Sequence, residues 1–263
     1  MRFTKYHINC HDIILLDGMN SGIEPARLPL AHLCDRRAGV GAETVAIVSP
    51  SHARNSGSSV LVRAFTADGN ERRLCADSIM AAARFCYDGG HVRSTSMTVE
   101  TPDGYKSLLV SPSQAGGDYT VTVDLGGANF QAMRSHSPFL SPECITLGDD
   151  FYLLECETPD AMPTHLVAAD LSVTPDNPAH VGFVVPETRE QLYLKLTKFG
   201  SMPGDNVADS TGAAAAAALM IHKNQCARNV IVRMDGGDCI VYCDNNAHFL
   251  VTAPVGYGFT GQL

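Results

Sequence analysis

Short runs of β-branched and other apolar residues dominate the chain and recur along its whole length. Runs of this length and composition are typical of β-strands. They predict strands at Ile13–Leu16, Val45–Val48, Val60–Phe65, Met97–Val99, Tyr119–Leu125, Phe151–Cys156, Gly182–Val185, Val230–Val232 and Ile240–Tyr242.

Three segments have a helical pattern instead, namely Pro25–Arg36, Asp77–Tyr87 and Thr211–Lys223. The last two are apolar or small along most of their length, and a helix that is apolar all round is buried. A strand-rich chain with two buried helices predicts an α+β fold of two curved sheets, each wrapped around one central helix.

The two halves of the chain repeat the same order of features. Cys75 precedes one buried helix and Asp209 precedes the other, and each follows a loop that contains Gly and Asp. A strand and a turn come after each helix, at Pro102–Gly104 and Asp235–Gly237. This is the outline of a duplicated domain. The expected domains are residues 1–120 and 121–254.

Composition narrows the class of protein. The 263 residues are 45% hydrophobic and 18% charged, which is ordinary for a soluble globular protein with one large domain or two smaller ones. The net charge of -9, with no Lys/Arg run longer than a pair, argues against nucleic acid or an anionic membrane as partner. We expect a small-molecule substrate.

The expected cellular location and metal content of the protein rest on motifs that the sequence lacks. No apolar run approaches the roughly 18–20 residues of a membrane span, and the N-terminus lacks the layout of a secretory signal, so we expect a cytoplasmic protein. The nine cysteines are scattered and odd in number, so free thiols are expected. No Cys-x-x-Cys pair occurs, and we expect no metal.

The starts of the two buried helices carry the candidate chemistry. A buried helix N-terminus offers backbone N–H groups and the positive end of a dipole, which suit a carboxylate or an enolate-like transition state. The same field favours the thiolate form of a first-turn thiol, so Cys75 is a candidate proton carrier. Alternatively, Cys75 is a buried core residue and Asp209 is a helix N-cap. Both interpretations can hold together.

Several motifs, in the right order, resemble the diaminopimelate epimerase family. They are similar to its opening, its Cys-Asp-Arg-x-x-Gly-x-Gly-Ala segment, its Phe-Asn-Ala-Asp-Gly loop ending in the first catalytic Cys, and its closing segments. The matching segments are Met1–His7, Leu33–Ala42, Phe65–Gly69 with Leu74-Cys75, Val99–Thr101, Gly236–Asp238, Val251–Pro254 and Phe259–Gly261.

The resemblance implies two pseudo-symmetric domains with the active site in the cleft between them, and a strand near residues 255–263 that returns to the N-terminal domain. It also implies inversion at an amino-acid α-carbon without pyridoxal phosphate (PLP) or any other cofactor. Two opposed thiols do this work: one takes the proton and the other returns one from the opposite face. A homodimer is compatible with the sequence.

The chain departs from the family at three motifs. Ala208–Ala213 aligns with Ala-Cys-Gly-Thr-Gly-Ala, so Asp209 stands where the family has its second thiol. Ala76-Asp77-Ser78 replaces Gly-Asn-Gly, which adds a carboxylate at the helix start. Gly200-Ser201-Met202 replaces the Glu-Arg-Gly segment that holds the distal end of diaminopimelate.

His11, Thr66 and His180 align with Asn residues of the family, although Asn177–His180 also matches its Asn-Pro-His segment. The hydroxyls of Thr44 and Thr66 suit ligand hydrogen bonds and equally suit hydroxyls satisfied within strands. The resemblance thus implies Cys75 and Asp209 as the catalytic pair. The implied substrate-binding residues are His11, Thr44, Thr66, Ala76, Asp77, His180, Ser201, Ser210 and Thr211.

These departures predict an isomerase that acts on an amino acid or amino-acid-derived metabolite other than diaminopimelate. Without the Arg clamp, and with Asp77 and Asp209 added, a dianionic substrate is disfavoured by several kcal/mol. Asp77 also places a like charge beside a substrate α-carboxylate unless a cation intervenes, so a ligand with a basic group, or without a free carboxylate, is an option. Other options are a proton-shift isomerase, a cyclase, a dehydratase or a non-catalytic paralogue.

Overall fold

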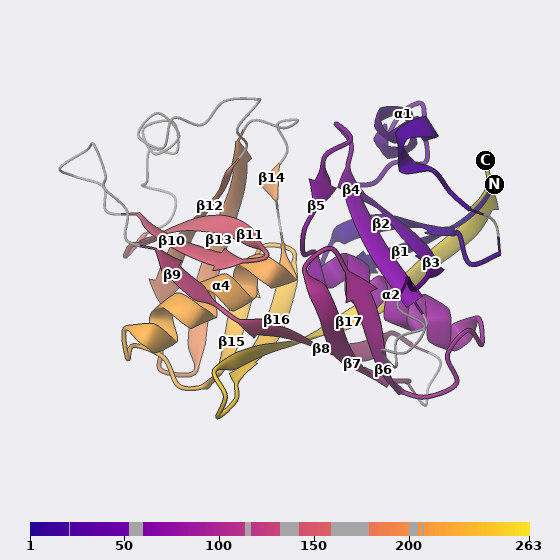
Figure 1. Cartoon of the computed structure of the whole chain (residues 1–263). Helices are drawn as coiled ribbons and strands as arrows, with labels where there is room; N and C mark the ends of the chain where they lie inside the picture. Colours follow the sequence, from indigo (N-terminus) through magenta and orange to yellow (C-terminus); the bar gives the residue numbers. More distant parts are fainter. Residues whose placement is uncertain are drawn as a thin grey trace. The chain divides into compact units, whose positions relative to one another are not determined.

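The computed structural model describes residues 1–20, 22–52, 60–113, 117–131, 142–158, 179–199, 205–206 and 208–263, and the structural statements below concern these residues. The chain forms two compact units (Figure 1). Unit 1 comprises Met1–Asp124 and Thr252–Leu263, and unit 2 comprises Leu125–Val251.

Eight strands form the barrel of unit 1, and a ninth, the short β5, lies beside β4. Antiparallel pairs β1–β2, β3–β4, β6–β7 and β7–β8 are joined by the parallel pairs β2–β3 and β4–β6. β17 pairs with β1 and β8 and so closes the barrel, and the short β5 pairs with β4. The bounds are β1 Arg2–Ile8, β2 His11–Asp17, β3 Thr44–Pro50, β4 Val60–Thr66, β5 Glu71–Arg72, β6 Ser96–Thr101, β7 Gly104–Ser111, β8 Tyr119–Gly127 and β17 His248–Gln262.

The helix α2, Ala76–Asp88, is the centre of unit 1 and contacts β1, β2, β3, β4 and β7. Nearly all of its first turns are buried, and the small side chains of Ala81, Ala82 and Ala83 let the surrounding strands approach closely. The guanidinium of Arg84 is satisfied inside the unit, since it donates to the carbonyl of Val255 and lies over the ring of Tyr119.

Unit 2 repeats this pattern around the helix α4, Ser210–His222, which contacts β10, β11, β12, β13, β15 and β16. Antiparallel pairs β9–β10, β10–β11, β12–β13 and β15–β16 combine with the parallel pairs β11–β12 and β13–β15, and β14 pairs with β13. The bounds are β9 Asn129–Gln131, β10 Glu143–Leu147, β11 Asp149–Glu155, β12 Ala179–Pro186, β13 Gln191–Phe199, β14 Asp205–Asn206, β15 Asn229–Met234 and β16 Gly237–Cys243.

The two units share one connection scheme. In each unit, an antiparallel pair of strands is joined by a parallel pairing to a second antiparallel pair. A short strand, β5 or β14, then precedes the central helix. The strand after the helix pairs in parallel with a strand before it, β6 with β4 in unit 1 and β15 with β13 in unit 2. The predicted fold class, an α+β fold of two pseudo-symmetric units with a buried central helix, is confirmed. The nine predicted strands and the two predicted buried helices are confirmed as well.

The predicted helix Pro25–Arg36 is wrong in its extent. A short 3-10 helix, Pro25–Arg27, is followed by the separate helix α1, Leu30–Cys34. Pro29 explains the break, because its ring disfavours helical geometry in the preceding residue, and Leu28 is extended with ψ 136°.

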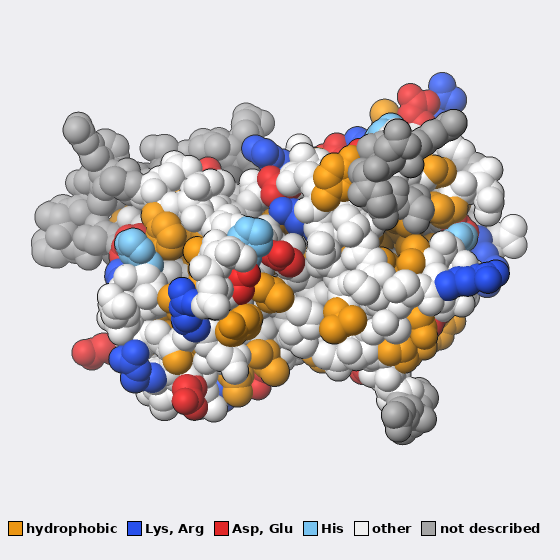
Figure 2. All heavy atoms as spheres, turned by 60° about the horizontal axis from the view of Figure 1, so that its bottom comes forward, with side chains coloured by type: hydrophobic (Ala, Val, Ile, Leu, Met, Phe, Trp, Pro, Cys, Tyr) orange, Lys and Arg blue, Asp and Glu red, His pale blue; other side chains and the backbone are white. Residues whose placement is uncertain are grey.

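The surface carries no single dominant feature on the face shown in Figure 2, where hydrophobic side chains lie in several separate groups among polar ones. Scattered exposed hydrophobic residues of this kind are normal for folded proteins. Among the described residues, no helix is both long enough and apolar enough to cross a membrane.

Candidate functional site

One end of the unit 1 barrel gathers most of the predicted site residues of that unit. β2 begins at His11, β3 begins at Thr44 and β4 ends at Thr66, and Thr44 pairs in register with Thr66. Ile13, two residues into β2, pairs with Thr44 in the parallel step. Side chains from residues far apart in sequence therefore meet at this end of the barrel.

A tight turn fixes the start of β2. Asn9 and Cys10 both have positive φ, 48° and 66°, between the paired residues Ile8 and His11. Positive φ at both central residues is the signature of a type I′ turn, whose twist matches that of a β-hairpin. The position of His11 is thus set by the hairpin.

Asp12 fastens the neighbouring loops to this end of the barrel. Its carboxylate accepts two hydrogen bonds of 2.8 Å from Arg36 and lies 2.9 Å from Nζ of Lys5. It also accepts the backbone N–H of Glu43 at 3.1 Å, just before Thr44. Burial alone would raise the pKa of Asp12, but the hydrogen bonds and charges of Arg36 and Lys5 outweigh burial and lower that pKa.

Cys75 is the N-cap residue of α2 and is buried, with 2% of its surface exposed. Its side chain makes no capping hydrogen bond. Instead Nη1 of Arg72, a buried residue of β5, donates to its sulfur at 3.7 Å. A guanidinium and a helix N-terminus beside one sulfur both favour the thiolate, which is the reactive form.

Arg72 was not singled out from the sequence. Arg72 and Arg73 form one of the Lys/Arg pairs of the chain, and neither sequence position nor charge distinguishes the buried member. The only available signal was its position three residues before Cys75.

Asp77, His11 and Thr44 form a buried hydrogen-bonded chain. Nδ1 of His11 lies 2.7 Å from Oδ2 of Asp77, and Nε2 lies 3.0 Å from Oγ1 of Thr44. The exposed fractions of Asp77 and His11 are both 1%, and that of Thr44 is 0%. The structure thus brings four of the residues predicted to bind substrate, His11, Thr44, Ala76 and Asp77, together with Cys75 around the first turn of α2.

The hydroxyl of Thr66 is engaged in its own turn. It donates to the carboxylate of Asp68 and lies 3.1 Å from the carbonyl oxygen of Asn70. These contacts stabilise the loop between β4 and β5, which leads to Arg72.

In unit 2, Asp209 occupies the position that Cys75 has in unit 1. It is the N-cap residue of α4, is fully buried, and accepts the backbone N–H groups of Thr211 at 2.9 Å and Gly212 at 3.0 Å through Oδ1. Oγ of Ser210 lies 3.4 Å from the sulfur of Cys239 on β16, a contact that the sequence did not predict. The first turn of α4 therefore holds a carboxylate and two buried hydroxyls, those of Ser210 and Thr211.

The remaining predicted residues of unit 2 lie elsewhere. His180 is on β12, half-buried, with its ring 4.9 Å from that of Phe151. Ser201 lies outside the described residues, and so does the segment in which the family's distal clamp is replaced. Among the described residues, no group of three or more His, Cys, Asp or Glu side chains is arranged to hold a metal ion.

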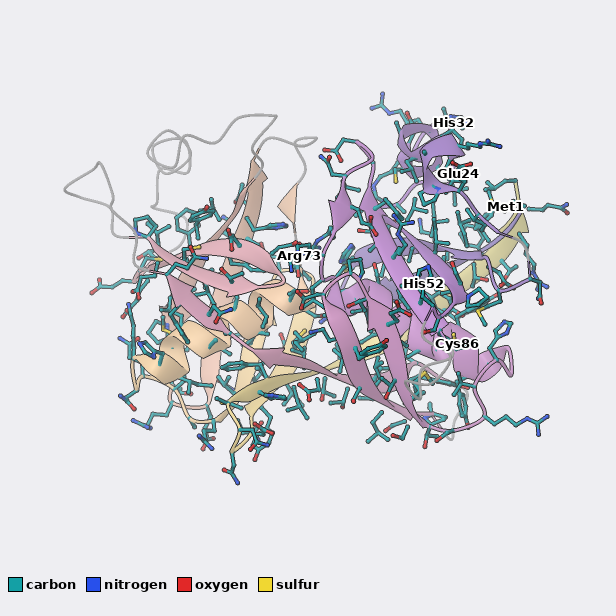
Figure 3. All side chains as sticks on the ribbon, viewed as in Figure 1. Met1, Glu24, His32, His52, Arg73 and Cys86 are labelled. Atoms are coloured by element: carbon teal, nitrogen blue, oxygen red, sulfur yellow. The ribbon has the colours of Figure 1, made fainter. Side chains whose placement is uncertain are left out.

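The other cysteines are not in disulfides, and most of them are buried. Burial raises the pKa of Cys34 to about 11, that of Cys144 to about 11 and that of Cys86, on α2, to about 12 (Figure 3). Such thiols stay protonated near neutral pH and are suited to a structural role.

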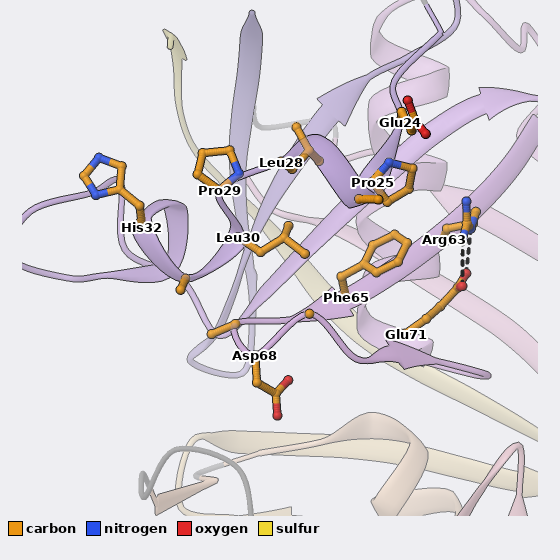
Figure 4. Close-up of a pocket in the computed structure, with 14 residues that line it drawn as sticks. Glu24, Pro25, Leu28, Pro29, Leu30, His32, Arg63, Phe65, Asp68 and Glu71 are labelled. Carbon is orange, nitrogen blue, oxygen red and sulfur yellow. Dashed lines mark hydrogen bonds and ion pairs between the residues drawn. The ribbon is translucent and has the colours of Figure 1, made fainter. Parts of the chain in front are cut away.

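A cavity of about 760 Å³ opens in unit 1 beside α1 and the loop between β4 and β5 (Figure 4). An Arg63–Glu71 ion pair, Phe65 and Leu30 are among its lining residues. None of the predicted site residues lines it.

Comparisons with known proteins agree with the motifs. The diaminopimelate epimerase family model matches residues 3–131. A diaminopimelate epimerase from Pelotomaculum thermopropionicum is 26% identical over 286 residues, an alignment that covers 100% of this chain and 98% of that enzyme.

Solved structures share the fold at lower identity. A predicted epimerase from Pseudomonas aeruginosa has a TM-score of 0.77 at 13% identity, covering 100% of this chain and 98% of that one. A hydroxyproline epimerase from Agrobacterium vitis, with bound trans-4-hydroxy-L-proline, has a TM-score of 0.75 at 12% identity, with coverages of 100% and 90%. The resemblance is confirmed: the chain is similar to diaminopimelate epimerases along its whole length and shares the fold of the solved epimerase structures.

Proposed function

We propose that this chain is a PLP-independent isomerase that moves the α-proton of an amino acid or amino-acid-derived metabolite other than diaminopimelate. Cys75 and Asp209 act as its acid/base pair. The full-length similarity to diaminopimelate epimerases supports the reaction type, since those relatives are epimerases.

The observation that carries this proposal is the equivalence of Cys75 and Asp209. Each is the buried N-cap residue of the central helix of its unit, reached through the same order of strand pairs. Each also carries a side chain that can exchange a proton. The Arg72 guanidinium beside Cys75 favours the thiolate, which is the form needed to remove a proton.

In the proposed reaction, the Cys75 thiolate or the Asp209 carboxylate removes the α-proton, and the C–H electron pair moves into an enolate-like intermediate. The N-terminus of a central helix stabilises the charge that develops. The other group, in its protonated form, returns a proton to the opposite face of the carbon. Exchange with solvent then resets both groups.

The substrate is proposed to lack the distal carboxylate of diaminopimelate. Support comes from the sequence alone, where Gly200-Ser201-Met202 stands in place of Glu-Arg-Gly. A bidentate Arg–carboxylate contact is worth several kcal/mol at reduced dielectric, so its loss removes most selectivity for a second carboxylate.

The test is incubation of the protein in deuterated water with a panel of L-amino acids, including proline, hydroxyproline and diaminopimelate. We expect label at the α-carbon together with inversion for at least one member other than diaminopimelate. Both Cys75→Ala and Asp209→Asn should reduce that rate by about 10²–10⁴-fold, the usual contribution of a general acid or base. Turnover of diaminopimelate alone would contradict the substrate proposal, and label uptake without inversion would contradict epimerisation.

A second candidate rests on the carboxylate of Asp209. A single carboxylic acid can move a proton between two carbons, or protonate a leaving hydroxyl more readily than a thiol does, so a double-bond shift, cyclisation or dehydration is the alternative. The same incubation separates these outcomes, because label would then appear at a second carbon or the product would lose water. In a non-catalytic paralogue, no member of the panel would take up label.

A further inference from the structure

The hydrogen-bonded side chains of Asp77, His11 and Thr44 place an ionisable pair, Asp77 and His11, in the interior of unit 1. The three side chains come from α2, β2 and β3, and all are at least nine-tenths buried. A buried carboxylate carries a large desolvation penalty unless a cation or several donors compensate it. His11, with Nδ1 at 2.7 Å from Oδ2 of Asp77, can supply such a cation.

Other charged side chains at this end of the barrel have contacts of their own. Arg72 donates to Cys75, and Asp12, whose side chain points to the opposite face of β2 from that of His11, holds Lys5 and Arg36. The distance of 2.7 Å falls in the range of charge-assisted N–H···O bonds. At its other nitrogen, His11 lies 3.0 Å from the hydroxyl of Thr44, which can accept an N–H bond.

We propose that His11 is a positioning residue held as an imidazolium between Asp77 and Thr44, so that the Asp77–His11 pair adds no net charge to the first turn of α2. This inference deepens the proposed function of the same site and rests on it. The ion pair then takes the place of two neutral Asn side chains, since both His11 and Asp77 align with Asn residues of the family. The substrate need not bring a cation of its own, and a free carboxylate at this helix end is compatible with Asp77.

Geometry supports a positioning role for His11. The Asn9-Cys10 turn and the Ile8–His11 register fix its backbone, and Thr44 and Asp77 bind both ring nitrogens. The ring cannot rotate without breaking two buried hydrogen bonds, which would leave buried polar groups without compensation. His11 therefore sets the orientation of Asp77, two residues from Cys75.

The first test is independent of turnover. The full chain is labelled with ¹⁵N-histidine, and the ring nitrogens are observed at pH 7.5, with the His11 signals assigned by their loss in His11→Asn. We expect both ring nitrogens of His11 to be protonated in the wild type and one to be unprotonated in Asp77→Asn. A neutral His11 ring in the wild type would overturn the proposal, whether or not any substrate is found.

The second test is a pair exchange. His11→Asn and Asp77→Asn are each expected to lower the rate of α-label exchange at least about 10-fold, whereas the double variant should recover to within about 3-fold of the wild type, as expected for coupled neighbours. Melting temperatures should follow the same order. Additive losses in the double variant would refute the coupling. If no amino acid takes up label, the proposed function fails, while the melting temperatures and the ¹⁵N spectra still decide the role of His11.

Discussion

At the residue scale, the contact between Arg72 and Cys75 gives the N-terminal half of the site its chemical character. The sulfur is buried, and burial alone disfavours a thiolate. The guanidinium donor at 3.7 Å and the start of α2 act in the opposite direction. Which effect dominates determines whether Cys75 removes protons at neutral pH.

Replacing Arg72 tests this balance. Arg72→Met keeps most of the packing volume but removes the charge, so we expect label exchange at neutral pH to slow by about 10-fold or more. Arg72→Lys is the matched control, because it retains a cation and should lose less activity. A wild-type exchange rate in Arg72→Met would show that the guanidinium does not activate the thiol.

The strained residue of the β1–β2 turn allows a test of stability. Cys10 is exposed, yet it has φ 66°, which places its backbone in the left-handed region, where a residue with a Cβ is strained. Cys10→Gly creates the Asn-Gly pair favoured in type I′ turns, and we expect the free energy of unfolding to rise by about 0.5–1 kcal/mol in denaturant titrations. Cys10→Ala, which still requires positive φ in a residue with a Cβ, should give no gain. A loss of stability in the Gly variant would mean that the turn needs the thiol.

At the element scale, Asp209 has a structural role that is separate from any chemistry. Its carboxylate caps α4 through the N–H groups of Thr211 and Gly212. We expect Asp209→Ala to lower the free energy of unfolding by about 1 kcal/mol and Asp209→Asn by less than about 0.5 kcal/mol, because Asn also caps helices well. Denaturant unfolding measures both.

The Asp209→Asn variant separates the two interpretations of Asp209. If Asp209→Asn keeps its stability and loses label exchange, the carboxylate is needed for chemistry as well as for capping. If Asp209→Asn exchanges label at the wild-type rate, Asp209 is an N-cap only.

The elements that could be predicted from the sequence are those with a local signal. The apolar helices α2 and α4 have one, and so do the β-branched runs of strands such as β3 and β15. β7 was missed because its apolar run is only Leu108–Val110 and one of its buried positions is Lys106. The C-terminal part of β17 is rich in Gly, and a strand there was expected from the resemblance alone, not from a local pattern. In these strands, pairing with neighbours decides the structure, and pairing is not a local property.

The candidate site shows the same limit. Its individual residues were predicted from motif alignment, including His11, Thr44 and Asp77. Their hydrogen-bonded chain was not predicted, because it depends on the register of β2 against β3 and on where α2 begins in the barrel. The negative charge that Asp77 adds to the first turn of α2 is accompanied by the ring of His11, 2.7 Å away.

At the scale of the whole molecule, the duplicated architecture encloses thiols in both units. Burial raises the pKa of Cys34 to about 11 and that of Cys86 to about 12 in unit 1, and that of Cys144 to about 11 in unit 2. In the folded state, each of these pKa values lies above the ordinary cysteine pKa of 9.0. The folded state therefore keeps these protons over a pH range in which the unfolded chain has lost them.

The consequence is a specific loss of stability in alkali. Below about pH 9 the thiols are protonated in both the folded and the unfolded state, and their contribution to the free energy of unfolding is complete. Above about pH 9 the unfolded state releases these protons first. The free energy of unfolding therefore falls as the pH rises toward the pKa values of the folded state. Cys86→Ala removes one such group. Between pH 9 and about 12, the upper value being the pKa of Cys86 in the folded state, the fall in the free energy of unfolding should become shallower in Cys86→Ala by up to about 1.4 kcal/mol per pH unit.

The measurement is urea unfolding with a reductant at several pH values. Ile79→Val, which removes a buried methyl group from the same helix, is the control: it should lower stability equally at every pH. An unchanged slope in Cys86→Ala would show that the thiol does not resist ionisation in the folded state.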